Sequence, residues 1–130
     1  MVAGALAHAD ISVIVNPAND AALNNDEIKD IFLGKRVKFP NASTAKPVDQ
    51  ADGRATRNEF YTLVVGKDEN EIKVYWSTLI FTGNGRPPKS LADDGEVKRF
   101  VHEDVAGIGY IDAKAVDKSV KVIYTAKSAN

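Results

Sequence analysis

The stretch of sequence best suited to bind a ligand is a turn at positions 50–56, which leads into a helical pattern. A glycine-containing turn before a helix leaves several backbone N–H groups without intrahelical partners, at the positive end of the helix dipole. Such groups bind oxyanions without basic side chains, and an arginine or a hydroxyl adds further donors. We therefore interpret the turn as a candidate oxyanion site formed by Gln50, Asp52, Gly53, Arg54, Ala55 and Thr56.

A purely structural interpretation of the same turn stays open. Thr56 and Glu59 have the spacing of a capping box, in which Thr56 is the N-cap of a helix and Glu59 is its reciprocal partner. In that case Arg54 and Arg57 are solvated surface residues. The two interpretations differ in whether the N–H groups of the turn face a ligand or only the protein's own caps.

Local patterns predict the elements that must position this turn. The β-branched run Ile11–Val15 predicts a buried strand. Ile28, Ile31 and Phe32 predict a short amphipathic helix that begins near Asn24 and ends at Gly34. Other patterns predict an extended stretch at Pro47-Val48, helices from Thr56 to Gly66, from Asp68 and from Asp93, and strands over 107–111 and 120–124. The helix from Asp68 has Ile72, Tyr75, Trp76, Leu79 and Ile80 on its expected buried face.

Strands interleaved with helices indicate an α/β fold. We expect a single compact domain with a mixed, mostly parallel sheet flanked by helices. The domain is predicted to span residues 10–125, after a residual signal peptide or disordered start over residues 1–9 and before a tail over 126–130.

Two further segments carry charge or turn-forming residues. Lys35, Arg36 and Lys38 form a basic group after the first helix, where positive charge complements the helix C-terminus. The loop Thr82–Pro88 contains two glycines and two prolines, which is typical of a lid, a docking rim or a simple change of chain direction.

The composition excludes several classes of function. The 130 residues include 17 Lys and Arg and 18 Asp and Glu, a net charge of -1, so no broad positive field exists to attract nucleic acid. Cysteine is absent, and His8 and His102 are too few for an ordinary catalytic zinc site. The sequence has neither a Gly-x-Ser-x-Gly elbow nor a calcium-loop pattern. We expect no enzyme activity, no metal site and no cofactor.

The first residues indicate export. Ala7-His8-Ala9 has the A-x-A form that signal peptidase cleaves, and small apolar residues precede it. We interpret this segment as the end of a signal peptide, with Asp10 as the first mature residue and a periplasmic location. An alanine-rich start without function is the alternative.

Three segments together resemble a known family. They are Asp30-Ile31-Phe32-Leu33-Gly34-Lys35, the stretch Val48 to Thr56, and Gly107-Ile108-Gly109-Tyr110-Ile111, whose order and separation match the phosphate-binding proteins of ABC transporters. The segments Phe81-Thr82-Gly83 and Arg86-Pro87-Pro88 are similar to those of short, single-domain relatives. The resemblance implies one lobe of a type 2 periplasmic binding protein, a family whose usual members close two lobes around the anion.

The turn departs from the pattern of that family, which reads approximately Arg-Ala-Asp-Gly-Ser-Gly-Thr. Gln50 replaces the arginine, Arg54 the serine and Ala55 the glycine, whereas Asp52, Gly53 and Thr56 agree. The resemblance therefore implies Thr56 and the neighbouring amides as ligands. We hypothesise that Arg54 restores the guanidinium missing at position 50, from the other side of the turn.

Two functions follow from these observations. The first is an exported domain that binds phosphate or a similar oxyanion, with about millimolar affinity because a lone lobe leaves the anion hydrated. Dimerisation would then complete the site, and an ABC-type phosphate uptake system would be its partner. The second is an interaction or adaptor protein that keeps the fold, binds no ligand and contacts a membrane transporter or sensor.

Overall fold

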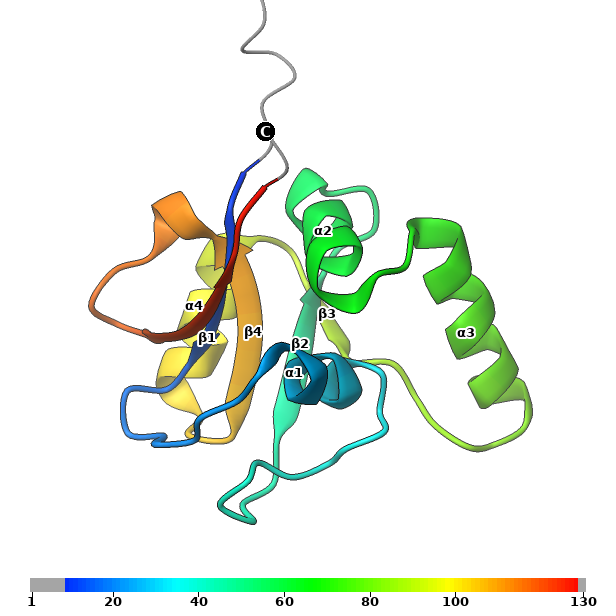
Figure 1. Ribbon diagram of the computed structural model, residues 1–130, viewed down its shortest axis with the longest axis horizontal. Coiled ribbons are helices and arrows are strands. Elements are labelled where there is room, and N and C mark those ends of the chain that lie inside the picture. Colours follow the sequence, from blue (N-terminus) through cyan, green and yellow to red (C-terminus); the bar gives the residue numbers. More distant parts are fainter. Residues whose placement is uncertain (1–8, 129–130) are drawn as a thin grey trace, which may run out of the picture.

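The computed structural model describes residues 9–128, which form one sheet of five strands in the order β3-β2-β4-β1-β5 (Figure 1). β1 is antiparallel to both neighbours, β4 and β5, whereas β2 is parallel to β3 and β4. The expected mixed sheet is confirmed. Among the described strands, two pairs are parallel and two are antiparallel, whereas we expected mostly parallel pairs. The antiparallel pairs arise because β4 and β5 both run in the direction opposite to β1. The strands are Ile11–Val15 (β1), Lys46–Gln50 (β2), Lys89–Leu91 (β3), Gly107–Asp112 (β4) and Lys121–Ala126 (β5).

Helices cover both faces of the sheet, with α1 and α2 in front and α4 behind in Figure 1. The side chains of β1 alternate accordingly: Val13 packs in the cluster that includes α1 and α2, and Ile14 packs in the cluster with α4. Both faces of β1 are therefore buried, which explains its continuous apolar run. The helices are Asn25–Phe32 (α1), Ala55–Phe60 (α2), Glu69–Phe81 (α3) and Asp94–Glu103 (α4), with a π-helical segment Tyr61–Val65 (η2) and a 3₁₀ turn Ala113–Ala115 (η3).

Capping confirms three of the expected helix starts, at Asn24, Asp68 and Asp93, and corrects a fourth. Asn24 accepts a 2.8 Å hydrogen bond from the backbone N–H of Glu27, whose carboxylate accepts one from the Asn24 N–H at 2.9 Å. Asp68 forms the same capping box at the start of α3. The capping box expected at Thr56 is wrong, because the N-cap of α2 is Arg54, which makes no side-chain capping bond. Gly53 has a φ of 87°, so the turn closes before Thr56 and Thr56 already lies within the helix.

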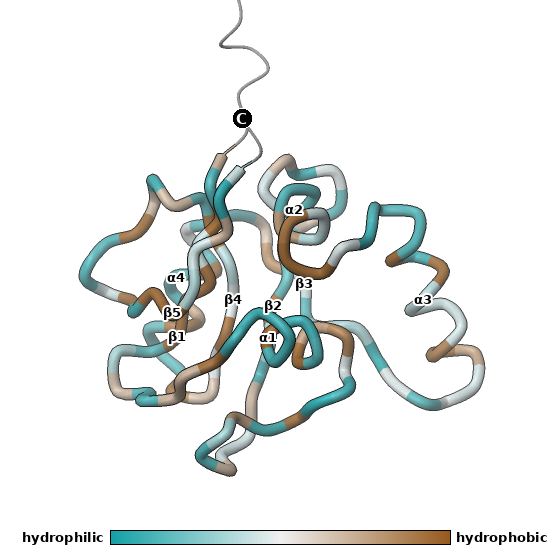
Figure 2. Tube along the Cα trace, viewed as in Figure 1, coloured by the Kyte–Doolittle hydropathy of each residue, from teal (hydrophilic) through white to brown (hydrophobic). Residues whose placement is uncertain are grey.

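The helix α3 lies at the margin of the molecule (Figure 1), and hydrophobic and hydrophilic residues alternate along it (Figure 2). Ile72 and Trp76 are buried as expected. Tyr75 and Leu79 are only partly buried, and Ile80 is exposed. The buried face of this helix therefore contains fewer residues than the pattern predicts. The sequence pattern gave the helix and its apolar residues, but the body of the protein covers only part of them.

The two ends of the described chain lie side by side (Figure 1). Ile11 pairs with Ala126, and the Asp10 carboxylate accepts a 2.9 Å hydrogen bond from the backbone N–H of Ser128. The strand β5 ends at the buried Ala126, one residue past the domain boundary expected at residue 125. The expected signal-peptide remnant lies outside the described residues, apart from Ala9. Within residues 9–128, no helix has the length and apolar character needed to cross a bilayer.

Gly109 in β4 provides a test of the packing between the sheet and α4. A Cβ at this position would lie 2.5 Å from Cγ1 of Val97 and 3.1 Å from Cγ2 of Val48. We expect Gly109→Ala to lower the free energy of unfolding by about 1–3 kcal/mol, because the added methyl group overpacks a closed interface.

Gly95→Ala is the matched control for that substitution. A Cβ at Gly95 meets only Oδ1 of Asp93, at 3.4 Å, and the position lies in the first turn of α4. We expect no loss of stability, and a gain of up to about 0.5–1 kcal/mol from the higher helix propensity of alanine. Urea denaturation measures both, and equal effects of the two substitutions would contradict the described packing.

Candidate functional site

The candidate site is the turn that joins β2 to α2. Gly53 adopts the left-handed conformation, and the backbone N–H of Arg54 donates to the carbonyl of Ala51 at 3.3 Å. The first N–H groups of the helix, those of Ala55, Thr56 and Arg57, have no partner within a helix by its geometry. Because Arg54 makes no capping bond, these amides are not satisfied by the N-cap side chain.

Arg54 and Gln50 are joined by a hydrogen bond. The Nε of Arg54 donates to Oε1 of Gln50 at 2.8 Å, and this bond holds the guanidinium beside the end of β2. Gln50 is fully buried, and its Nε2 donates to the carbonyl of Tyr110 at 2.9 Å and to Oδ1 of Asp94 at 2.7 Å. Gln50 therefore positions Arg54 and ties the turn to β4 and α4. Its amide is already used within the protein.

A buried carboxylate lies directly beneath the turn. Asp49 is 3% exposed, and its carboxylate accepts hydrogen bonds from the hydroxyl groups of Tyr61, at 2.5 Å, and of Tyr110. The backbone N–H of Gln50 donates to it at 2.9 Å, and Nη1 of Arg57 lies 3.0 Å from its Oδ2. Four donors from three parts of the chain thus converge on one side chain.

Arg57 is the cationic partner of Asp49 and is only 7% exposed. Its Nη1 also donates to the carbonyl of Gln50 at 3.1 Å, its Nε to Glu69 at 3.2 Å, and its Nη2 lies 3.5 Å from Asp52. The guanidinium carbon lies 5.1 Å from the centre of the Tyr61 ring. The expectation that Arg57 is solvated is wrong, because the buried carboxylate of Asp49 requires a cation beside it.

Burial shifts the ionisation of this cluster toward neutral forms of its acids. Desolvation raises the pKa of Asp49, and the charge of Arg57 together with the two tyrosine hydroxyls opposes that rise. Desolvation also raises the pKa of both Tyr61 and Tyr110, and the neighbouring Asp49 charge adds to it. The tyrosines therefore act as fixed hydrogen-bond donors under ordinary conditions.

The predicted site residues lie together in one turn, but their side chains differ in how far they are exposed to solvent. Gly53 and Ala55 are exposed, Arg54 and Thr56 are half-buried, and the side chain of Asp52 is mostly exposed although it reaches Arg57. Sequence reasoning missed the Asp49 cluster. The available signal was the spacing of Arg57 and Tyr61, which lie four residues apart and therefore on one helix face.

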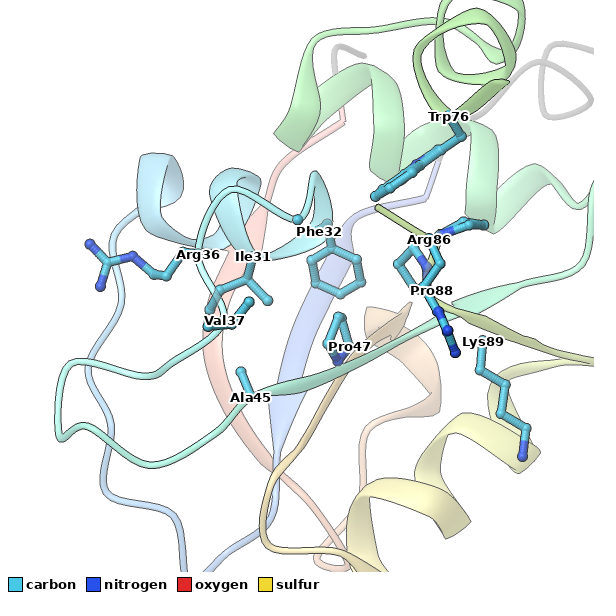
Figure 3. A pocket seen from close by; sticks show the side chains of 12 residues that line it. Ile31, Phe32, Arg36, Val37, Ala45, Pro47, Trp76, Arg86, Pro88 and Lys89 are labelled. Carbon is cyan, nitrogen blue, oxygen red and sulfur yellow. The ribbon is translucent and has the colours of Figure 1, made fainter. Parts of the chain in front are cut away.

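Two cavities lie on the α3 side of the turn. The Arg57 cavity, of about 370 Å³, is lined by Asp52, Arg57, Trp76, Pro88 and Ser90 among others. The Arg86 cavity, of about 270 Å³, is lined by Phe32, Pro47, Trp76, Arg86 and Lys89 among others (Figure 3). Residues 9–128 contain no cluster of acidic, histidine or cysteine side chains that could hold a metal ion.

The arrangement of sheet, helices and turn is that of one lobe of a phosphate-type substrate-binding protein. The chain is similar to an ABC-type phosphate transport receptor from Vibrio cholerae, with 22% identity and a TM-score of 0.71 over 88% of this chain and 46% of that one. It is also similar to a putative phosphate ABC transporter substrate-binding protein with bound phosphate from Clostridium perfringens, with 28% identity and a TM-score of 0.69 over 88% and 45%. PstS from Borrelia burgdorferi shares 13% identity at a TM-score of 0.64, over 88% and 47%.

The chain thus spans less than half the length of these solved structures. No family model and no curated protein matches the sequence. The predicted resemblance to phosphate-binding proteins of ABC transporters is confirmed at the level of structure, and the first two of these neighbours are named as transport proteins.

The hydroxyl of Tyr110 tests how strongly the Asp49 cluster holds the fold. Tyr110→Phe removes one donor from the buried carboxylate, and we expect the free energy of unfolding to fall by about 1–2 kcal/mol. Tyr124→Phe is the control, since the Tyr124 hydroxyl makes none of the hydrogen bonds found in residues 9–128, and we expect a change within about 0.5 kcal/mol. Thermal denaturation of both variants at neutral pH measures the difference. A loss of similar size in both would contradict the role given to the cluster.

The raised tyrosine pKa values predict a stability loss in alkali. The unperturbed pKa of tyrosine is 10.0, and above that pH the unfolded chain releases protons that Tyr61 and Tyr110 retain in the folded protein. Stability therefore falls as pH rises past 10. We expect tyrosinate absorbance to show that these two of the four tyrosines ionise only with unfolding. If all four tyrosines ionise while the circular dichroism spectrum still shows the folded protein, this expectation is wrong.

Proposed function

We propose that this chain is an exported, solute-binding lobe that binds phosphate or a similar oxyanion weakly at the turn formed by residues 50–56. Its partner in this proposal is an ABC-type phosphate uptake system. The neighbour from Clostridium perfringens was solved with bound phosphate, and the chain matches it at 28% identity. That similarity supports an oxyanion as the ligand.

The observation that carries the proposal is the bond from Arg54 to Gln50. It fixes a permanently charged, forked donor in the turn that also carries the first amides of α2 and Thr56. An oxyanion at this position would accept bonds from the guanidinium, the amides and the hydroxyl. Arg57 does not contribute a donor, because Asp49, Asp52 and Glu69 already surround it.

Weak binding follows from the exposure of the turn and from the nearby acid. An anion here keeps much of its hydration, and salt screens its charge over about 8 Å at physiological ionic strength. Asp94, bonded to Gln50, places a negative charge close to the same turn. A few charge-assisted bonds of about 1.5–3 kcal/mol each then offset the cost of association and leave about millimolar affinity. We propose that a second copy of the chain supplies the opposite wall when tighter binding is required.

The alternative is an interaction protein that keeps the lobe but binds no ligand. The observation that favours it is the exposed apolar surface of α3, where Phe81 is 92% exposed. The two functions differ in their response to phosphate, which stabilises the folded state only if it binds there.

Arg54→Ala separates these functions. Isothermal titration with phosphate should give about millimolar affinity for the unaltered chain, and the dissociation constant should rise roughly tenfold in the variant, because one charge-assisted bond is lost. Arg99→Ala removes an exposed arginine from α4 and should leave the affinity unchanged. Sulfate and buffer titrations control for unspecific anion effects.

Two outcomes count against oxyanion binding at this turn. One is unchanged phosphate affinity in Arg54→Ala. The other is the absence of heat and of any melting-temperature shift with millimolar phosphate, which supports the interaction protein instead.

A further inference from the structure

Cations and acids are distributed unequally along the chain. Residues 31–48 and 72–92 contain seven Lys and Arg residues and no acid, although the whole chain has a net charge of -1. All 18 Asp and Glu residues therefore lie outside these two segments. A local excess of cations around one cavity points to a partner that brings negative charge there, although Asp49 and Asp52 line the neighbouring Arg57 cavity.

The two segments meet around the Arg86 cavity. Figure 3 shows Trp76 projecting from α3 toward Phe32, with Pro47 and Pro88 nearby. The charged side chains that line this cavity are Arg36, Arg86 and Lys89, with no acid among them. Arg36 points away from the cavity (Figure 3), toward Glu27 at 3.8 Å. Arg86 and Lys89 take part in none of the ion pairs found among residues 9–128, so they remain available to an incoming anion.

Exposed apolar side chains line each of the two cavities: Val37 lines the Arg86 cavity, and Ile80 lines the Arg57 cavity. Of the six large hydrophobic residues that are exposed in the described chain, four belong to α3 or to the loop after α1. They are Val37, Val74, Ile80 and Phe81. Val37 and Ile80 add exposed apolar surface to the cavities, as is typical of an interaction site, whereas Val74 and Phe81 line neither cavity.

The strand β3 adds a recognition element between the two cavities. It is an edge strand, since it pairs with β2 alone, and Lys89 and Ser90 are exposed. Lys89 lines the Arg86 cavity and Ser90 lines the Arg57 cavity, while Trp76, Pro87 and Pro88 line both. The edge of a short strand can pair with an extended segment through backbone hydrogen bonds. In such a segment, every second side chain would face the cavities.

We propose that the edge of β3 binds an extended, acidic segment of a partner protein. Alternate apolar side chains of that segment fill the two cavities on either side of Trp76, and its carboxylates pair with Arg86 and Lys89. Charge complementarity selects this occupant over a second copy of the chain, because two-fold pairing of this surface would bring like charges together. The strand edge and the two cavities select it over an anionic membrane, which offers neither an extended backbone nor spaced side chains. This inference rests on the edge of β3, whose Arg57 cavity adjoins the oxyanion turn at Asp52, and it does not depend on phosphate binding.

The experiment uses Trp76 as its own reporter, since it is the single tryptophan of the chain. The probe is the peptide acetyl-Asp-Ser-Leu-Ser-Leu-Ser-Asp-amide, in which both leucines and both aspartates share one face of an extended segment. We expect it to shift Trp76 emission in a saturable way and to slow amide exchange in β3. The same peptide with lysine in place of aspartate, and a version with adjacent leucines, should bind more weakly.

Variants locate the charge contacts. In Arg86→Ala/Lys89→Ala, we expect the dissociation constant of the acidic peptide to rise roughly fivefold, as two exposed ion pairs are lost. Lys114→Ala/Lys118→Ala removes the same charge from exposed lysines elsewhere in the chain and should change the affinity little. Phosphate titration of Arg86→Ala/Lys89→Ala should match the unaltered chain, which separates this surface from the oxyanion turn.

Three results would overturn the proposal. The first is equal binding of the acidic and the lysine peptide, and the second is unchanged affinity in Arg86→Ala/Lys89→Ala. The third is a Trp76 shift with phosphatidylglycerol vesicles but not with the acidic peptide, which would assign the surface to a membrane.

Discussion

The buried carboxylate of Asp49 is the constraint on which this half of the molecule depends. A charge removed from water costs several kcal/mol unless a cation and hydrogen-bond donors surround it. Here the donors come from α2, η2 and β4, as Arg57, Tyr61 and Tyr110. To satisfy Asp49, these elements must therefore come together around the end of β2. The turn before α2 acquires its shape from this convergence.

The same constraint gives Arg57 a structural role and leaves Arg54 to the proposed oxyanion site. Arg57 faces inward and is enclosed by Asp49, Asp52 and Glu69, so its charge is neutralised inside the protein. Arg54 lies on the outer side, where Gln50 holds it through one hydrogen bond. A turn that looks doubly basic in the sequence thus offers a single guanidinium to solvent. This explains why the proposed oxyanion affinity is weak.

The helix α3 contacts both the turn and the two cavities beside β3. Glu69 at its start bonds to Arg57, and Trp76 near its middle separates the two cavities. Ile80 and Phe81, toward its end, are left uncovered. One helix therefore supports the proposed oxyanion site at its beginning and presents exposed apolar residues at its end. Both features fit a lobe that meets other molecules on more than one side.

The sequence by itself determined what depends on neighbours within a few residues. Examples are the capping boxes at Asn24 and Asp68, the glycine stop at Gly66, the buried strand at Ile11–Val15 and the order of motifs that indicated one lobe. Capping bonds, turns and hydrophobic periodicity depend on residues that are close together in the chain, so the amino-acid sequence alone is enough to predict them.

Only the tertiary structure decided the partners of Asp49, the direction of the strands beside β1, the short edge strand β3 and the exposure of Ile80. Asp49 and Tyr110 are 61 residues apart in the chain, and no local pattern records their contact. The capping pattern at Thr56 was even misleading, because Gly53 and the buried Arg57 move the start of the helix to Ala55. A charge in a strand can be solvated or buried, and only the chain that packs against it decides which.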